Sequence, residues 1–429
     1  MNVFKEAGGK KMALSKQQIS VVTVSTIAFT VCFAVWMMFA VIGIPIKKML
    51  SLNETQFGLL IATPVLTGSL IRLPLGMWTD KFGGRIVFFV LMLSTVAPIY
   101  MISLATQFWQ FLVAGLFVGM AGGSFSVGIA YVARWFPKKQ QGFAMGIFGA
   151  GNSGAAVTKF VAPAILVAFG WEMVPQVYAV AMLLTALAFW MFTYSDPAHK
   201  VSTSVTVKDQ LLALKDPRVW RLCQYYSIVF GGYVALALWM TKYYVSEYGF
   251  DIKIAALLAA AFSLPGGVLR AFGGYLSDKF GAHTVTWWVF WVSLVALFFL
   301  SYPQTQFTIM TVKGPETFHV GLNPTMFTVL MFVVGVSWAF GKASVFKYIS
   351  DDYPHNIGVI SGIVGLVGGL GGFVLPIVFG ALVDLTGIRS SAFMMLFGVV
   401  WVSLMWMYFS EVRPLHAEQE KKRTKAGTH

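Results

Sequence analysis

Long apolar segments separated by short polar ones recur along the whole 429-residue chain. Most reach roughly 20 residues, the length that an α-helix needs to cross the hydrocarbon core of a bilayer. The fold class that we expect is therefore an all-α membrane protein with twelve transmembrane helices. The expected spans are residues 19–45, 57–79, 85–105, 108–133, 142–168, 173–194, 220–244, 253–276, 283–302, 324–349, 357–381 and 390–410.

The longest polar interruption, residues 195–219, follows the sixth span. It predicts a cytoplasmic linker between two six-helix bundles, residues 1–194 and 220–429, the second of which includes the tail. Related motifs recur in the two halves, although an outer loop at residues 302–323 lengthens the second. Such a duplication is typical of secondary transporters, whose substrate site lies between the two repeats.

Composition agrees with a membrane protein, because 57% of the residues are hydrophobic and only 11% are charged. The net charge of +14 would suit nucleic-acid binding, but its distribution argues against that partner. With the N-terminus inside, and with cations at span ends counted with the adjoining segment, 21 Lys and Arg are cytoplasmic, 6 are in outer segments and 4 are in span interiors. This asymmetry predicts that both termini are cytoplasmic and that the surroundings are the lipid bilayer of the cytoplasmic (inner) membrane. Cys32 and Cys223 both lie in apolar spans, so no disulfide is implied.

Two of the cations inside spans occupy equivalent positions. Arg72 precedes Asp80 by eight positions, Arg270 precedes Asp278 by eight, and Lys-Phe-Gly follows each aspartate. The two copies lie 198 residues apart. Eight helical residues span ~12 Å, so each arginine is predicted near the middle of the membrane.

A charge at that depth costs about 3 kcal/mol or more and usually faces a partner or a cavity. All 17 acidic residues fall near span ends, in loops or in tails, and no histidine lies in a span interior either. The simplest completion is an anionic substrate, since guanidinium offers paired planar donors that match a planar oxyanion. We therefore predict that Arg72 and Arg270 bind an anion.

The segments around the two aspartates look like a loop motif of the major facilitator superfamily. The first copy is Gly76-x-x-x-Asp80-Lys81-x-Gly83-Gly84-Arg85, and its glycines would allow a tight turn between helices. The second copy is partial, because Ala282 and His283 replace the final Gly and Arg.

The fifth and eleventh expected spans are rich in glycine, over residues 142–163 and 358–376. Small residues every three or four positions let helices approach closely and slide. Asn152 is a polar residue inside the first of these runs, and amides in a membrane mark either helix contacts or a pathway. Gly151 and Gly365 are candidate pathway glycines of the two runs.

These glycine-rich runs, the Arg134-Trp-Phe-Pro137 that precedes the first, and the two arginines resemble the nitrate/nitrite porter family of the major facilitator superfamily. The resemblance covers essentially the whole chain. It implies that the arginines bind nitrate between aromatic side chains, and that Asn152, Gly151 and Gly365 belong to the signature helices that line and gate the pathway. Matched by local motif, the aromatic side chains are Phe33, Phe125, Tyr226 and Phe230.

The chain departs from the exchangers of that family at Lys159, Lys342 and Lys347, where those proteins have small or polar residues. The short N-terminus and the stretch Lys342-Ala-Ser-Val-Phe-Lys347 are more similar to the branch associated with proton-linked nitrate import. Proton-coupled carriers mostly use a membrane carboxylate or histidine, and no span interior here has one. A buried lysine can lose its proton, whereas arginine stays charged. We therefore expect Lys342 first, and Lys159 second, as proton-coupling groups, while Lys347 can snorkel to the inner surface.

The favoured hypothesis is a monomeric nitrate importer, also handling nitrite, that works by alternating access and nitrate:proton symport. The alternatives are a nitrate/nitrite antiporter and an organophosphate antiporter, which also uses paired arginines. A membrane anion sensor would need a regulatory domain, and none is visible in the sequence. No nucleophile–base set or metal-ligand cluster indicates an enzyme, and no cofactor is implied.

Overall fold

The structure, a computed structural model, describes residues 14–195, 208, 212–353 and 357–414. Nearly all of these residues are helical. The elements before the linker are α1 (Lys16–Trp36), α2 (Phe39–Met49), α3 (Glu54–Leu70), α4 (Arg72–Phe82), α5 (Gly84–Ile102), α6 (Phe108–Gly119), η1 (Met120–Gly123), α7 (Ser124–Arg134), α8 (Lys138–Gly149), η2 (Ala150–Ser153), α9 (Gly154–Phe169) and α10 (Met173–Phe192).

The elements after it begin three residues before the expected seventh span. They are α12 (Pro217–Tyr226), η3 (Ser227–Gly232), α13 (Tyr233–Tyr248), α14 (Ile252–Val268), α15 (Arg270–Phe280), α16 (Ala282–Leu300), β1 (Thr305–Thr311), β2 (Gly314–Val320), α17 (Pro324–Asp352), α18 (Ile357–Thr386), α19 (Ser391–Met407) and η4 (Tyr408–Val412).

The number of spans agrees with the sequence. Within the described ranges, 11 continuous helical segments are long and apolar enough to cross a membrane. The pair α14 and α15, bent by 48° at their junction, supplies the twelfth. The prediction of an all-α membrane protein is confirmed. Most of the expected linker at residues 195–219 lies outside the described residues.

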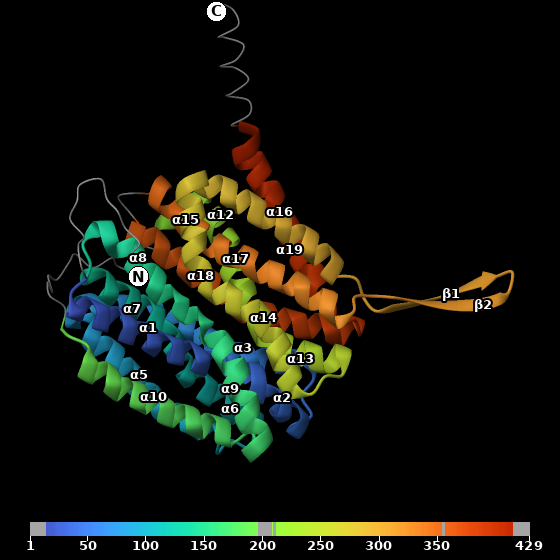
Figure 1. Cartoon of the computed structure of the whole chain (residues 1–429), viewed down its shortest axis with the longest axis horizontal. Coiled ribbons are helices and arrows are strands. Elements are labelled where there is room, and N and C mark those ends of the chain that lie inside the picture. Colours follow the sequence, from blue (N-terminus) through green and yellow to red (C-terminus); the bar gives the residue numbers. More distant parts are fainter. Residues whose placement is uncertain (1–13, 196–207, 209–211, 354–356, 415–429) are drawn as a thin grey trace, which may run out of the picture.

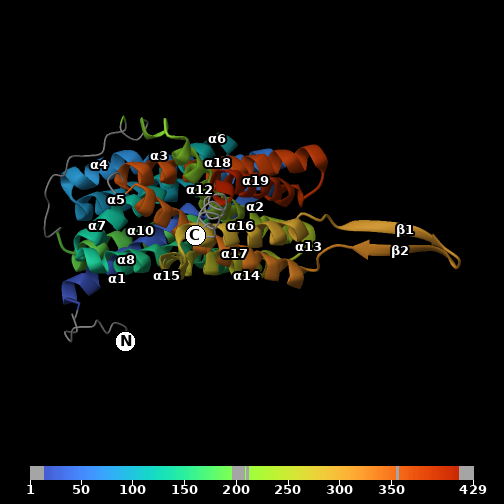
Figure 2. The ribbon, with the colours of Figure 1, turned by 90° about the horizontal axis from the view of Figure 1, so that it is seen from above.

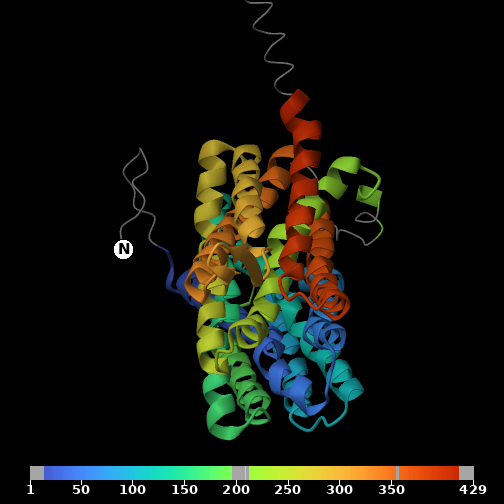
Figure 3. The ribbon, with the colours of Figure 1, turned by 90° about the vertical axis from the view of Figure 1, so that its right-hand side faces the viewer.

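The helices form two groups (Figures 1 and 3). The first group, α1 to α10, lies at one side of the molecule, and the second group, α12 to α19, lies at the other. The groups meet along two seams, where α3 packs against α18 and α9 packs against α14. An anion bound between the groups would contact residues from both.

One element was not expected. Strands β1 and β2 pair antiparallel, with Phe307 opposite Phe318, and project away from the helices (Figures 1 and 2). From the sequence, residues 302–323 were predicted to form a plain outer loop. Alternation of apolar and polar residues in the first strand was the signal that this prediction overlooked.

Breaks in two spans place the arginines. Arg72 is the first residue of α4 and Arg270 the first of α15, each directly after a one-residue break in the helix. Pro74 follows the first break and has no N–H for the carbonyl of Leu70, four residues earlier, so the helix is weakened there. Gly266 and Gly267 lower helix propensity just before the second break.

The repeated loop motif forms the turn that the sequence suggests. Gly83 and Gly281 end α4 and α15 with φ values of 88° and 86°, which residues with a Cβ rarely adopt. Asp80 forms an ion pair of 2.5 Å with Arg134 at the end of α7. In the second copy Asp278 lies 3.7 Å from Lys347, which also pairs with Asp351 at 2.6 Å. Lys347 therefore serves the helix ends and not the centre of the span.

The two groups are joined tightly at the end of the molecule where α3 begins. Asp384 of α18 accepts bonds from the backbone N–H groups of Glu54 and Thr55, at 3.0 and 2.8 Å. Glu54 also pairs with Lys242 of α13. At Gly58 of α3, an added Cβ would lie 2.2 Å from the carbonyl oxygen of Pro376 in α18. We call this region the closed end.

Candidate functional site

Arg72 and Arg270 converge on one aromatic ring. Their Cζ atoms lie 5.9 and 5.2 Å from the ring centre of Phe125, the second residue of α7. The two arginines thus approach each other from opposite groups, as the repeat predicts. Among the described residues neither guanidinium lies within ion-pair distance of a carboxylate.

A second set of rings completes the surroundings. Phe230 lies 5.2 Å from the Cζ of Arg72, and Phe346 lies 5.4 Å from the Cζ of Arg270. Tyr226 joins the two, because its ring is stacked on Phe230 and edge-on to Phe346, at 5.1 Å from each. Three of the four predicted aromatic residues, Phe125, Tyr226 and Phe230, are therefore in this cluster.

The fourth predicted ring, Phe33, reaches the cluster only indirectly. Its ring centre lies 5.8 Å from that of Phe29, which in turn lies 5.6 Å from Phe125. Gly151 supports the same contact, since an added Cβ would lie 2.3 Å from the Phe29 ring. Phe33 and Gly151 thus pack behind the Phe125 ring, which both arginines contact, through the ring of Phe29.

Asn152 and Gly365 contribute polar groups. The amide nitrogen of Asn152 is buried without a hydrogen-bond partner among the described residues, so it has a donor available. The carbonyl oxygen of Gly365 accepts a long bond of 3.4 Å from Arg72. An added Cβ at Gly365 would meet nothing within 4 Å. Close helix approach, the reason given for glycine from the sequence, therefore does not hold at Gly365, whereas its carbonyl faces the site.

The two candidate coupling lysines are both buried. The Nζ of Lys342 donates to the carbonyl of Gly266 at 2.5 Å and lies 3.5 Å from the centre of the Tyr233 ring. The Nζ of Lys159 donates to the Oγ of Ser263 at 2.8 Å. Within the described part of the chain neither lysine has a carboxylate partner.

The sequence analysis missed Phe346 and Phe29. Phe346 lies four residues after Lys342, on the same face of α17, so helical spacing from a buried cation was the available signal. Phe29 lies four residues before Phe33 on α1, and the same spacing applies. With 38 phenylalanines in the chain, neither spacing distinguishes these two without the fold.

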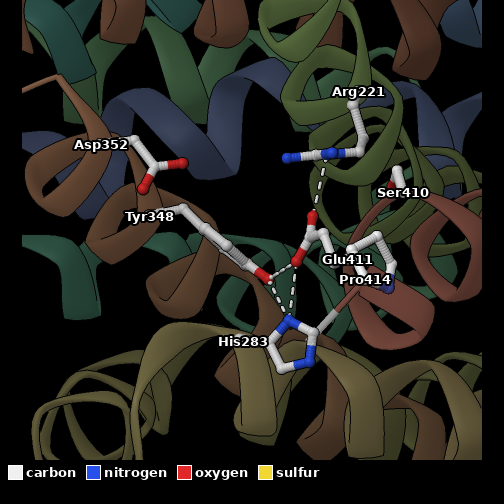
Figure 4. A pocket seen from close by; sticks show the side chains of 7 residues that line it. All are labelled: Arg221, His283, Tyr348, Asp352, Ser410, Glu411 and Pro414. Atoms are coloured by element: carbon white, nitrogen blue, oxygen red, sulfur yellow. Dashed lines mark hydrogen bonds and ion pairs between the residues drawn. The ribbon is translucent and has the colours of Figure 1, made fainter. Parts of the chain in front are cut away.

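A second polar cluster lines a pocket of about 330 Å³ at the ends of α12, α16 and α17 (Figure 4). Glu411 is its centre: it accepts a bond from Tyr348 at 2.6 Å, lies 2.7 Å from the Nδ1 of His283, and pairs with Arg221 at 2.9 Å. His283 stands where the first motif copy has Arg85. Because Glu411 and Asp352 both line this pocket, it does not suit an anion.

The arginine site is different in kind. It combines two guanidinium groups and aromatic faces, with no carboxylate paired to either arginine among the described residues. Guanidinium donors favour a small, planar, negatively charged molecule. The arrangement can bind such an anion where the two helix groups meet.

Comparison with known proteins shows the class of protein to which the chain belongs. The family model described as Major Facilitator Superfamily matches residues 24–376. The solved structure of a bacterial homologue of the human lysosomal transporter Spinster, in an inward-facing and occupied conformation, is similar in fold, with a TM-score of 0.70 at 16% identity. The similarity covers 92% of this chain and 97% of that one. The fold is therefore that of a major facilitator membrane transporter.

Relatives of known sequence define the family. The chain is 40% identical to the probable nitrate/nitrite antiporter NarK1 of Thermus thermophilus, over 94% of each chain. It is 32% identical to the probable nitrate transporter NarT of Staphylococcus carnosus, over 92% of this chain and 97% of the relative. The chain belongs to the nitrate/nitrite porter family of the major facilitator superfamily, as the sequence motifs indicate.

Proposed function

We propose that this protein imports nitrate, and also handles nitrite, across the cytoplasmic (inner) membrane by alternating access. One observation carries the proposal: Arg72 and Arg270 meet at Phe125 from opposite helix groups, with no paired carboxylate among the described residues. The names of both relatives include nitrate, which supports this substrate.

The geometry supports the following binding set, which is part of the proposal. Arg72 and Arg270 hold the anion, and Phe125, Phe230 and Tyr226 shape the space beside the two guanidinium groups. Asn152 offers one further donor, and Gly365 orients Arg72 through its carbonyl. Phe33 and Gly151 support Phe125 through the ring of Phe29.

Alternating access requires two bodies that rock about the site. We propose residues 1–194 and 220–429 as these bodies, joined by a cytoplasmic linker at 195–219, in a protein that works as a monomer. Both termini are then cytoplasmic, and the closed end faces outward. The excess of Lys and Arg in the segments assigned to the cytoplasm supports this orientation.

We further propose nitrate:proton symport, with Lys342 and Lys159 as the coupling groups. Both are buried without a paired carboxylate among the described residues, so each can exist as a neutral amine. A bound nitrate near Lys342 would favour the protonated lysine. Anion and proton would then bind together.

The second candidate is exchange of nitrate for nitrite, which the name of the Thermus relative favours. One experiment separates the two. Liposomes that contain the purified protein receive labelled nitrate with an inward proton gradient or, separately, with nitrite inside. Uptake that follows the proton gradient and acidifies the lumen supports symport, and uptake that requires internal nitrite supports exchange.

The same liposomes test the substrate itself. Excess unlabelled nitrate should reduce the uptake of labelled nitrate, whereas excess glycerol phosphate should not. Uptake of the organophosphate in place of nitrate would overturn the proposed substrate, and no flux of either anion would overturn transport of small anions at this site.

A further inference from the structure

Two buried lysines reach the same stretch of α14 from different helices. Lys342 donates to the carbonyl of Gly266, while Lys159 donates to the hydroxyl of Ser263, three residues earlier. The hydroxyl of Tyr233 donates to the Ser263 carbonyl at 2.8 Å, and its ring faces Lys342. The stretch from Ser263 to Gly266 therefore accepts hydrogen bonds from the Nζ atoms of both lysines.

The contacts of Lys342 stay within one helix group, whereas those of Lys159 cross between the two groups. Lys342 of α17 touches α13 and α14, which all belong to the second group. Lys159 is on α9 of the first group, so its bond to Ser263 crosses between the groups. The surfaces meet closely there, since a Cβ on Gly267 of α14 would lie 2.6 Å from the backbone nitrogen of Ser153. When the groups move apart at this seam, the bond of Lys159 must break.

This bond lies on the side of the arginines that faces the closed end. Gly149 adjoins Arg270, because an added Cβ would be 3.8 Å from the arginine Cδ. Lys159 follows Gly149 by ten residues, or ~15 Å along the helix. The contact between Lys159 and Ser263 is thus part of the seal between the anion site and the closed end.

The contacts of Lys159 fit its neutral form. Its Nζ has two acceptors, the Oγ of Ser263 at 2.8 Å and the carbonyl of Ala155 at 3.1 Å. A neutral amine has two N–H donors and both are used here, whereas an ammonium would keep a third donor and a full charge without a partner.

Among the described residues, the helices around Lys159 supply no acid to compensate such a charge. The helices packed closely on α9 are α1, α2, α10 and α14, and none of them contains Asp or Glu within its bounds. Their titratable side chains are Lys16, Cys32, Lys47, Lys48, Tyr178 and Lys253. Beyond these helices, the nearest titratable groups along the same path are Tyr233 of α13, Arg270 of α15 and Lys342 of α17.

We propose that the outer seal forms in two conditions, with Lys159 neutral or with Lys159 protonated and the anion bound, and that it does not form with Lys159 protonated and the site empty. In the first condition the amine binds Ser263 as described. In the second, the negative charge at the arginines offsets the ammonium. Protonated lysine without anion leaves an unpaired buried charge and prevents closure. The carrier therefore returns empty only after the proton has left, and a proton crosses only together with an anion.

The inference rests on the proposed nitrate transport, and Lys159→Arg tests it because arginine keeps its charge at every accessible pH. The loaded carrier can still close, so exchange of internal for external labelled nitrate should stay within about twofold of wild type. The empty carrier cannot close, so net uptake should fall by about tenfold or more, as a buried unpaired charge requires. Both modes are measured in the same liposomes.

A second variant should lose proton movement instead of net nitrate uptake. Lys159→Gln cannot bind a proton, so net nitrate uptake should persist while luminal acidification per nitrate is lost. The control is Lys253→Gln, which removes an exposed lysine from the start of α14 and should keep proton and nitrate flux linked. Nitrate binding to the purified variants, followed by tryptophan fluorescence, shows that the site is intact.

The outcomes separate this inference from the function on which it rests. Wild-type protein that moves no nitrate overturns the proposed function. Wild-type transport together with normal net uptake by Lys159→Arg overturns the lysine proposal alone. Equal loss of net uptake and exchange in Lys159→Arg, with nitrate binding retained, also overturns it, and so does proton flux per nitrate that is unchanged in Lys159→Gln.

Discussion

At the scale of single residues, the two arginines differ from lysines by geometry and not by charge. Each guanidinium presents planar paired donors beside the shared ring of Phe125, and an ammonium at the same place is a point charge. We expect Arg72→Lys and Arg270→Lys each to lower nitrate uptake by about tenfold or more, the loss of one charge-assisted bond of about 1.5–3 kcal/mol. Initial uptake rates in liposomes measure the effect.

The matched control is Arg389→Lys, at an arginine that is half exposed and pairs with Glu247. It should transport nitrate as the wild type does, because exposed pairs contribute little. Near-normal uptake by an Arg72→Lys or Arg270→Lys protein would contradict the assignment of that arginine.

Phe346 is expected to tune affinity. Its ring faces Arg270 and supports Tyr226, so Phe346→Ala removes one cation–π contact, worth about 0.5–2 kcal/mol. The KM for nitrate should rise severalfold, while correctly inserted protein is still made. Phe332→Ala is the control, because that ring is exposed on the same helix, and a KM equally raised in both variants would argue against a role for Phe346.

The residues that could be found from their own chemistry are those that are unusual in a membrane, whereas Phe125, Tyr226 and Phe230 were found only through the family resemblance. Arg72, Arg270, Lys159 and Lys342 were visible because a buried charge needs an explanation and because the arginines repeat. Phe346 was not visible, since its importance comes only from the ring and the guanidinium that the fold brings beside it. Composition gives no such information about a common apolar residue.

At the scale of elements, the glycines of α18 differ in how closely other helices pack against them. A Cβ at Gly368 would lie 2.3 Å from the Tyr226 ring, and one at Gly369 would lie 2.3 Å from the Oγ of Ser69, whereas Gly365 has open space. These two close contacts fall on helices of different groups, α12 and α3. The middle of α18 is therefore held between both groups of helices.

The difference in space at Gly368 and Gly365 can be tested by placing alanine at each position. Gly368→Ala should lower nitrate uptake severalfold or more, because the added methyl group displaces Tyr226 from the rings beside the arginines. Gly365→Ala should be tolerated, because its carbonyl is unchanged. Uptake by the two variants, corrected for the amount of inserted protein, measures the difference, and a greater loss in Gly365→Ala would contradict this account of α18.

Element boundaries show where sequence patterns are informative. Apolar length predicted the spans well, because the bilayer imposes that length. It could not show the break between α1 and α2 after Trp36, or those at the two arginines, since local kinks leave the total apolar length unchanged. The hairpin at residues 305–320 was missed because strand patterns in seven residues are weak.

At the scale of the whole molecule, the two helix groups are closed at one end by polar contacts that cross between them. Asp384 of α18 acts as a cap for α3, because it accepts the free N–H groups of that helix's first turn. Asp251 caps α14 in a similar way, but within its own group. Only the first of these caps has to break when the closed end opens.

This difference predicts how each cap affects the conformational equilibrium. Loss of a capping side chain costs about 1 kcal/mol, roughly a fivefold change in an equilibrium constant. Asp384→Ala should therefore shift the protein toward the state with this end open, whereas Asp251→Ala should lower stability without that shift. Val65 reports the change, because it is buried between α3 and α18 beside Gly372.

Thiol labelling measures the shift. A protein with Val65→Cys as its single cysteine should react about fivefold faster with a membrane-impermeant reagent when Asp384→Ala is added, the ratio expected for one lost cap. It should react at its original rate when Asp251→Ala is added instead. A protein that keeps only Cys32, which is buried inside the first group, should stay unreactive in both backgrounds. Equal acceleration at Cys32 would indicate general loosening, and no acceleration at Val65→Cys would show that Asp384 does not hold the closed end.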